Sequence, residues 1–334
     1  MTGTCSRVLL RLDAGHAVGL GHAVRARALL EALGRPLDLV VAGRGEALAA
    51  QFPAARHVPC GAGGDADLAD LVARESPDLV LVDLPHLPES GWRALRGAGR
   101  PVAAVDDEGG AVVADLVING TVLDRYHHYP ALPPGARLLC GADYTLLRPA
   151  FGQTAWEAGA ARGVVAVAGG GAWADLLAGP TLDRAGGGPV RLVVGPACPG
   201  VEALAARAAR HGVVLRQGLS PSALAGALAR ARVALVTGGM VLYEAMAVGV
   251  PAVVFPQMPN LPPEADWFAA RGAVRTLGDE GGMDEARLAA EVTALLGDEA
   301  AARAQSRAAR ALVDGRGLAR AALALGTLLT EATR

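Results

Sequence analysis

Short apolar segments alternate along this chain with longer stretches of alanine, leucine and arginine, and this alternation is what most limits the folds open to it. The apolar segments have the length of single strands, and the stretches between them have helical periodicity. Continuous apolar runs are typical of strands buried on both faces, as in parallel sheets whose strands are joined by crossover helices. The pattern therefore predicts an α/β fold.

The same pattern sets the expected elements. We expect helices to begin near His22, Asp65 and Ser90 in the first half. Expected strands cover residues 7–12, 37–42, 79–83, 102–106 and 116–119, then 164–168, 190–194, 213–216, 233–236 and 252–255. The second half repeats the architecture of the first.

At 334 residues the chain exceeds what one hydrophobic core usually organises, so two domains are expected. Residues 1–145 form the expected N-terminal Rossmann-like domain and residues 164–334 the C-terminal one. The segment 146–163 is rich in proline, glycine and alanine and is the expected linker. We expect the last helix to pack back on the N-terminal domain, and ligands to bind in a cleft at the carboxyl ends of the strands.

Composition excludes several classes of function. All 31 basic residues are arginine, which removes Schiff-base chemistry and the P-loop lysine, and a net charge of −2 gives no broad basic face for nucleic acid. A charge or a proline interrupts every long apolar stretch, and no signal peptide is evident, so we expect a cytoplasmic protein without stable membrane insertion. Four scattered cysteines indicate reduced structural thiols.

A glycine-containing turn after the first expected strand carries the strongest local signal. Its marked positions are Asp13, Gly19, Gly21, His22 and Arg25. The third glycine of a dinucleotide fingerprint is missing, and no acidic residue ends the second strand, so NAD is not the expected cofactor. A helix N-terminus disfavours a charged imidazolium, which leaves a histidine there available as a base. We expect His22 to be that base and Asp13 to orient it; a histidine that merely caps its helix is the competing interpretation.

A second turn follows the expected strand 233–236. Gly238 and Gly239 lead into a helix that begins at Met240, so backbone N–H groups can approach a pyrophosphate without an obstructing side chain. Glu244 lies a little over one helical turn further on, where its carboxylate can accept hydrogen bonds from a ribose diol. The alternative is an ordinary strand-turn-helix with an exposed glutamate.

Three weaker features complete the candidates. Gly170 and Gly171 form a third glycine turn, which we expect to contribute to nucleotide binding. The acidic run Asp106–Glu108 is either a paired-acid site or, more commonly, a turn that caps the following segment. The adjacent pair His127–His128 points to opposite sides of an extended segment, so no metal site is predicted.

Taken in order, these motifs resemble the UDP-sugar hydrolases of the pseudaminic acid pathway and the related spore-coat polysaccharide proteins, which are similar to MurG-type glycosyltransferases of the GT-B fold. The resemblance covers most of the chain. Its matching positions are Arg11, Asp13, Gly19, Gly21, His22, Arg25, Asp83, Asp106, Asp107, Asn119, Cys140–Tyr144, Arg148, Gly238, Gly239, Tyr243, Glu244 and Gly249–Pro251.

The resemblance implies a GT-B-like fold and a UDP-sugar substrate. It implies that His22 activates water and that Gly238, Gly239 and Glu244 hold UDP, and we expect Met240 to adjoin them. The expected substrate residues are Gly19, Gly21, Arg25, Tyr144 and Asn260.

Departures from the family fall mainly on the sugar side. Gly171 is followed by Ala-Trp173 where the family has Thr-Asp or Ser-Asp, and Pro85 and His86 replace the usual tyrosine. The usual Asn-Gln pair keeps only Asn260, since leucine follows it. These departures imply that the sugar, or even the acceptor, differs from the pseudaminic intermediate.

Three functions follow from the sequence. The preferred one is an inverting hydrolase that breaks the anomeric C–O bond of a UDP-sugar and releases a free amino or deoxy sugar. The alternatives are a glycosyltransferase with the same donor site and a non-catalytic protein that binds nucleotide-sugars. No cofactor, metal, nucleic acid or obligate protein partner is predicted.

Overall fold

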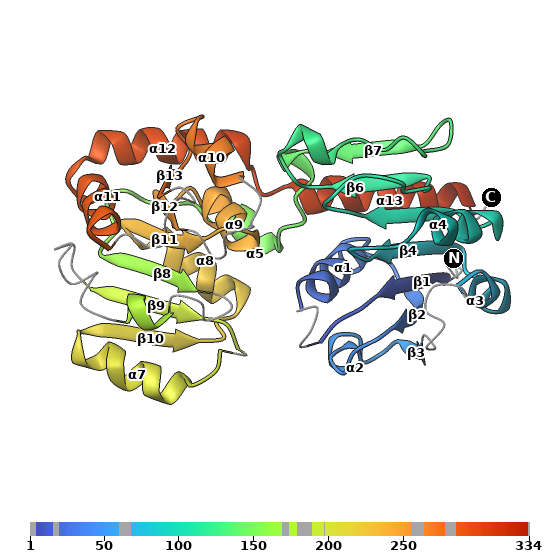
Figure 1. Ribbon diagram of the computed structural model, residues 1–334, viewed down its shortest axis with the longest axis horizontal. Helices are drawn as coiled ribbons and strands as arrows, with labels where there is room; N and C mark the ends of the chain where they lie inside the picture. Colours follow the sequence, from blue (N-terminus) through green and yellow to red (C-terminus); the bar gives the residue numbers. More distant parts are fainter. Residues whose placement is uncertain are drawn as a thin grey trace. The chain divides into compact units, whose positions relative to one another are not determined.

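The structure is a computed structural model that describes residues 5–15, 20–59, 68–168, 174–178, 189–196, 198–255, 264–277 and 285–332. The chain forms two α/β units (Figure 1). The first unit contains residues 1–146 and 316–334, and the second contains residues 147–315. The expected α/β class is confirmed.

The first unit is built on a parallel sheet with the strand order β3-β2-β1-β4-β5-β6-β7 among the described residues. Its strands are β1 (Ser6–Leu12), β2 (Leu37–Gly43), β3 (Arg56–Pro59), β4 (Leu79–Asp83), β5 (Val102–Val105), β6 (Leu116–Asn119) and β7 (Arg137–Cys140). The order reverses at β1, which pairs with β2 on one side and β4 on the other. Ligands of doubly wound sheets bind at such a switch point.

Helices cover both faces of this sheet. They are α1 (Gly21–Glu31), α2 (Leu48–Gln51), α3 (Leu68–Glu75), α4 (Glu89–Gly97) and α13 (Gly317–Ala332), with short 3-10 turns η2 (Asp124–Tyr126) and η3 (Ala142–Tyr144). Successive strand residues point to opposite faces. Val8 and Leu10 of β1 accordingly join the core beneath α1 and α13, whereas Leu9 joins the core beneath α3 and α4. Double burial is the reason that the strands read as continuous apolar runs.

The second unit repeats the plan with the parallel order β10-β9-β8-β11-β12-β13. Its strands are β8 (Val164–Ala168), β9 (Val190–Val194), β10 (Val213–Gln217), β11 (Val233–Thr237), β12 (Ala252–Phe255) and β13 (Arg275–Thr276). Its helices are α5 (Pro149–Gln153), α6 (Ala174–Leu177), α7 (Val201–Arg210), α8 (Pro221–Ala229), α9 (Met240–Val248), α10 (Glu264–Ala269), α11 (Glu285–Gly297) and α12 (Glu299–Leu312). The switch point lies between β8 and β11.

Three strands were absent from the sequence-based expectation. β3, β7 and β13 are edge strands, so each is paired on one side only among the described residues. An edge strand can stay partly exposed and needs no continuous apolar run. Their sequences are short and partly polar, for example Arg-His-Val-Pro in β3, and the apolar pattern does not mark them.

The chain passes from the first unit to the second after residue 146 and returns after residue 315, and these two points differ from the expected domain limits. Residues 147–163, which include most of the expected linker, belong to the second unit: α5 packs against α8 and α9, and the indole of Trp156 donates to the carbonyl of Ala231. After residue 315 the chain returns to the first unit, where α13 lies beside β6 and contacts α1 and η3 (Figure 1). In the described part of the chain, no helix is both long enough and apolar enough to cross a membrane.

Candidate functional site

A buried histidine–aspartate pair lies at the switch point of the first sheet. His22 is the second residue of α1, and Asp83 is the last residue of β4. Leu12 at the end of β1 is in register with Asp83, and the start of α1 lies over that carboxylate. The Nδ1 atom of His22 lies 2.6 Å from Oδ1 of Asp83, whose side chain is fully buried.

Arg25 stabilises the charge of this aspartate. It lies one helical turn after His22, and its Nε and Nη2 atoms donate to the two oxygens of Asp83 over 2.8 and 2.6 Å. Burial alone would raise the pKa of Asp83, but the charge and hydrogen bonds of Arg25, together with the bond to His22, lower it below its ordinary value. Asp83 is therefore ionised and can only accept hydrogen bonds.

The ionised carboxylate fixes the histidine tautomer. Nδ1 of His22 must carry the proton that it donates to Asp83, which leaves the lone pair on Nε2. Nε2 has no hydrogen-bond partner among the residues that the structure describes, and the side chain is one-fifth exposed. This arrangement suits a base that accepts a proton from solvent or substrate. The capping interpretation is wrong: α1 has no side-chain cap, and the ring bonds to Asp83 instead.

Asp13 does not orient His22, contrary to expectation. Its carboxylate accepts hydrogen bonds from the buried guanidinium of Arg11 and from both the backbone and the side chain of Arg44. Burial works against ionisation, but these donors lower the pKa of Asp13 overall. Asp13 thus fastens the end of β1 to the segment after β2, and the orienting role that we expected for it falls to Asp83.

Arg25 also departs from its expected role as a substrate residue. Besides its bonds to Asp83, its Nη1 atom donates to both oxygens of Asp107, over 3.0 and 2.7 Å. The side chain is only 14% exposed. Its guanidinium nitrogens thus donate hydrogen bonds to Asp83 and Asp107. Arg25 is therefore placed to stabilise the His22–Asp83 pair rather than to contact a sugar.

The acidic run after β5 caps a turn. Oδ2 of Asp106 accepts bonds from the backbone N–H groups of Glu108 and Gly109 and from the hydroxyl of Tyr129. Asn119 donates to the same hydroxyl. This network explains why the run follows a strand without forming a paired-acid site. No group of three or more potential metal ligands lies together in the described segments.

In the second unit, the turn after β11 exposes the start of α9. Gly239 has φ 78° and ψ −155°, a combination that essentially only glycine adopts. A Cβ atom at this residue would meet nothing within 4 Å, so the space beside the turn is open. Gly239 and Met240 are exposed, and Gly238 is half-buried. The first N–H groups of α9 are thus accessible to an anion.

Gly239→Ala should therefore lower the free energy of unfolding by about 1–3 kcal/mol, because alanine is strained in this conformation. Gly297→Ala is the matched control: it lies in the same unit, its Cβ would also meet nothing within 4 Å, and its φ is not positive. Urea unfolding of the two variants measures the difference. Equal midpoints would show that the turn relaxes to accept a side chain.

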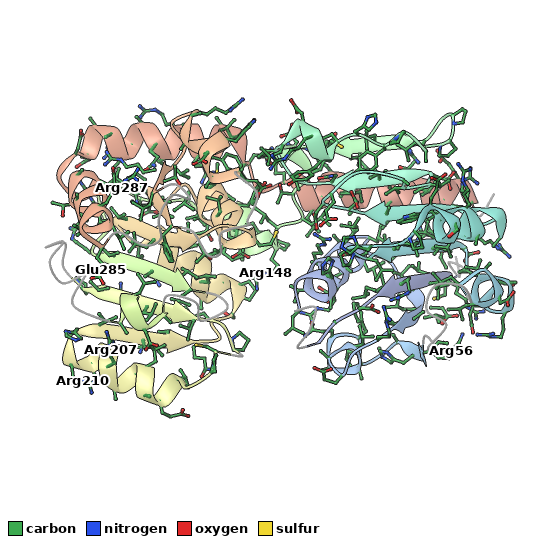
Figure 2. All side chains as sticks on the ribbon, in the orientation of Figure 1. Arg56, Arg148, Arg207, Arg210, Glu285 and Arg287 are labelled. Atoms are coloured by element: carbon green, nitrogen blue, oxygen red, sulfur yellow. The ribbon has the colours of Figure 1, made fainter. Side chains whose placement is uncertain are left out.

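Glu244 lies buried inside the same unit, so the alternative of an exposed glutamate is wrong. The residue is 6% exposed, and its Oε1 atom accepts a hydrogen bond of 2.7 Å from Nη2 of Arg148. Figure 2 labels Arg148 beside α5 and α9. Burial raises the pKa of Glu244, and the charge and hydrogen bond of Arg148 partly offset that rise.

The remaining candidates divide into two groups. Gly21 is exposed as the first residue of α1, and Tyr144 packs half-buried against the core of the first unit. Gly19, Gly170, Gly171 and Asn260 lie outside the described residues. Asp83 and Arg148 are matching positions of the family resemblance, but the sequence assigns a role to neither. The position of Asp83 at the end of a buried strand was a usable signal, whereas nothing in the sequence connects Arg148 to Glu244.

Comparison with known proteins supports the architecture. No family model matches the chain. It is 26% identical to the spore coat polysaccharide biosynthesis protein SpsG of Bacillus subtilis (strain 168) over 336 residues, which cover 96% of this chain and 97% of the relative.

Solved structures with the same fold include MurG of Acinetobacter baumannii (TM-score 0.64, 16% identity, 98% of this chain and 99% of the other). A putative UDP-N-acetylglucosamine 2-epimerase of Listeria monocytogenes has a TM-score of 0.64 at 15% identity, and the match covers 98% of this chain and 97% of the other. A UDP-GlcNAc 2-epimerase of Neisseria meningitidis bound to UDP-GlcNAc has a TM-score of 0.61 at 12% identity, and the match covers 97% of this chain and 100% of the other. The two parallel-sheet units of this chain accordingly have the GT-B-like fold.

Proposed function

We propose that this protein is an enzyme of carbohydrate biosynthesis that hydrolyses a UDP-sugar at its anomeric C–O bond. The observation that carries the proposal is the His22–Asp83 pair, in which a fixed tautomer leaves Nε2 free at the carboxyl end of the first sheet. The similarity to a spore coat polysaccharide protein supports the pathway class. The UDP-GlcNAc bound to the Neisseria meningitidis epimerase, which has the same fold, supports the substrate class.

The chemical step needs one base and one stabilised leaving group. Nε2 of His22 accepts a proton from water as the water oxygen bonds to the anomeric carbon. The C–O bond to UDP breaks, and its electron pair goes to the β-phosphate oxygen. Asp83 stabilises the imidazolium that forms, through the Nδ1–H bond. No cofactor or metal takes part in this sequence of events.

The second unit supplies the proposed nucleotide residues. The N–H groups at Gly239 and Met240 begin α9, where the positive end of the helix stabilises phosphate charge. Glu244 accepts hydrogen bonds from the ribose, since Oε2 has no other partner in the described residues while Arg148 occupies Oε1.

Hydrolysis in ¹⁸O-labelled water tests which bond breaks. With UDP-sugars as substrates and no acceptor, we expect the label in the free sugar, inversion at the anomeric centre and unlabelled UDP, as in a single displacement at carbon. Mass spectrometry locates the label, and ¹H NMR of the first product gives the anomer. Label in UDP would show attack at phosphorus and overturn the proposal. Release of UDP only after an acceptor is added would indicate glycosyl transfer instead.

A further inference from the structure

Glu244 is an unusual group to leave buried. Its side chain is 8% exposed, and it lies on α9 among apolar residues such as Leu242 and Met246. An isolated carboxylate in such surroundings becomes protonated rather than charged. A protonated carboxyl keeps only part of the acceptor capacity that a ribose diol requires. The protonation state of Glu244 therefore depends on the charged groups near its side chain.

Arg148 is the group that faces it. Its Nη2 atom lies 2.7 Å from Oε1 of Glu244, across 96 positions of sequence. Among the described residues it is the only hydrogen-bond partner of Glu244, so Oε2 is left unbonded. Two other charged groups near α9 are engaged elsewhere: Arg310 donates to the carbonyl of Val248, and Glu264 accepts from Tyr243.

Arg148 is itself held in place. Its backbone is extended, with φ −61° and ψ 140°, immediately before α5. Its guanidinium carbon lies 5.1 Å from the ring centre of Phe151, which is fully buried in α5. Such stacking fixes a planar guanidinium more firmly than it would a flexible ammonium group. Since α5 packs against α9, the guanidinium reaches Glu244 from a rigid support.

We propose that Arg148 is a positioning residue that orients Glu244 and makes the second unit select nucleoside diphosphates that carry both ribose hydroxyls. This inference rests on the proposed function, because it assumes that Glu244 meets the ribose. Arg148 binds Oε1 and so presents Oε2 to the diol. Its positive charge and hydrogen bond partly offset the rise that burial causes in the pKa of Glu244, and so favour the ionised carboxylate.

Isothermal titration calorimetry with UDP and 2′,3′-dideoxy-UDP tests the proposal. Wild-type protein should prefer UDP by about tenfold to a hundredfold, the usual worth of hydrogen bonds to a charged group. Arg148→Met should reduce this preference at pH 7 to about threefold or less, with the affinity for dideoxy-UDP unchanged. The unchanged affinity shows that the variant is folded and that its phosphate site is intact.

The pH dependence of the preference for UDP distinguishes a positioning role of Arg148 from a purely structural one. The preference for UDP should grow as pH rises through the pKa of Glu244, because the ionised form accepts better. Removing Arg148 takes away a group that lowers this pKa, so the midpoint should lie at higher pH in Arg148→Met than in wild type. Arg148→Lys keeps the charge and should move the midpoint back toward that of wild type.

Two further variants complete the test. Glu244→Gln should reduce the preference for UDP to about threefold or less at every pH, because the amide keeps one acceptor oxygen and does not titrate. Arg207→Met makes the same chemical change on the exposed surface of α7, in the same unit and apart from Arg148 (Figure 2), and should behave as wild type.

The possible failures are distinguishable. If wild type binds neither nucleotide, or if Glu244→Gln keeps the preference, the proposed nucleotide role of Glu244 is wrong. If Glu244→Gln loses the preference but Arg148→Met keeps it with an unshifted midpoint, the proposed function stands and the role of Arg148 is overturned.

Discussion

Replacing His22 with asparagine is expected to lower kcat about 10²- to 10⁴-fold, the contribution of a well-placed general base. The affinity for UDP should stay close to that of wild type, because the proposed nucleotide residues belong to the other unit. Steady-state release of UDP and calorimetry with UDP measure the two quantities. A parallel loss of both would mean that the substitution disturbs more than the chemical step.

Two companion variants sharpen this result. His128→Asn changes an exposed histidine of the same unit and should leave kcat unaltered. Asp83→Asn should lose turnover, because a neutral amide no longer requires Nδ1 of His22 to carry the proton. Full turnover in His22→Asn would place the base elsewhere, with His86 the next histidine to examine.

The second large effect concerns stability. Arg25→Met should lower the free energy of unfolding by about 3–5 kcal/mol, because it leaves the buried carboxylate of Asp83 without its cation. Arg27→Met is the matched control on the same helix. Arg27 pairs with Glu31 at 3.6 Å in an exposed position, and such pairs contribute at most about 1 kcal/mol. Urea unfolding compares the two variants.

The pH dependence of this loss has a definite sign. In wild type the pKa of Asp83 is below its ordinary value of 3.8, so its ionisation stabilises the fold above that pH, and the contribution is lost as pH falls through the lowered value. Without Arg25, burial dominates and raises the pKa of Asp83, so the variant loses stability as pH rises above 3.8. The gap between wild type and variant should therefore be widest near pH 7 and narrow toward pH 4. A gap independent of pH would assign the effect to packing alone.

The position of His22 shows how far local pattern reaches. A glycine-containing segment between a buried strand and a helix predicts that α1 begins near His22, and His22 is its second residue. The local pattern does not identify the hydrogen-bond partner of His22. Asp13 is the acidic residue of the same motif, yet it is bound by Arg11 and Arg44. The true partner, Asp83, lies 61 positions away.

Strand order is the reason for that difference. Since β4 pairs with β1, the end of β4 lies beneath the start of α1, while the end of β1 turns toward the segment after β2. The periodicity of the sequence does not indicate the order of the strands in the sheet. The same holds for Glu244: its place one turn into α9 is readable from the sequence, but its burial and its bond to Arg148 arise from the packing of α5 on α9.

The sequence by itself determined the class of fold, the buried strands and the residues at their carboxyl ends, because double burial marks each parallel strand with its own apolar run. Tertiary structure alone decided the edge strands β3, β7 and β13 and the ion pairs of Asp83 and Glu244. Burial of a strand produces an apolar pattern in consecutive residues, which can be recognised in the sequence. The partner of a buried charge is instead set by contacts between segments that are distant in the chain.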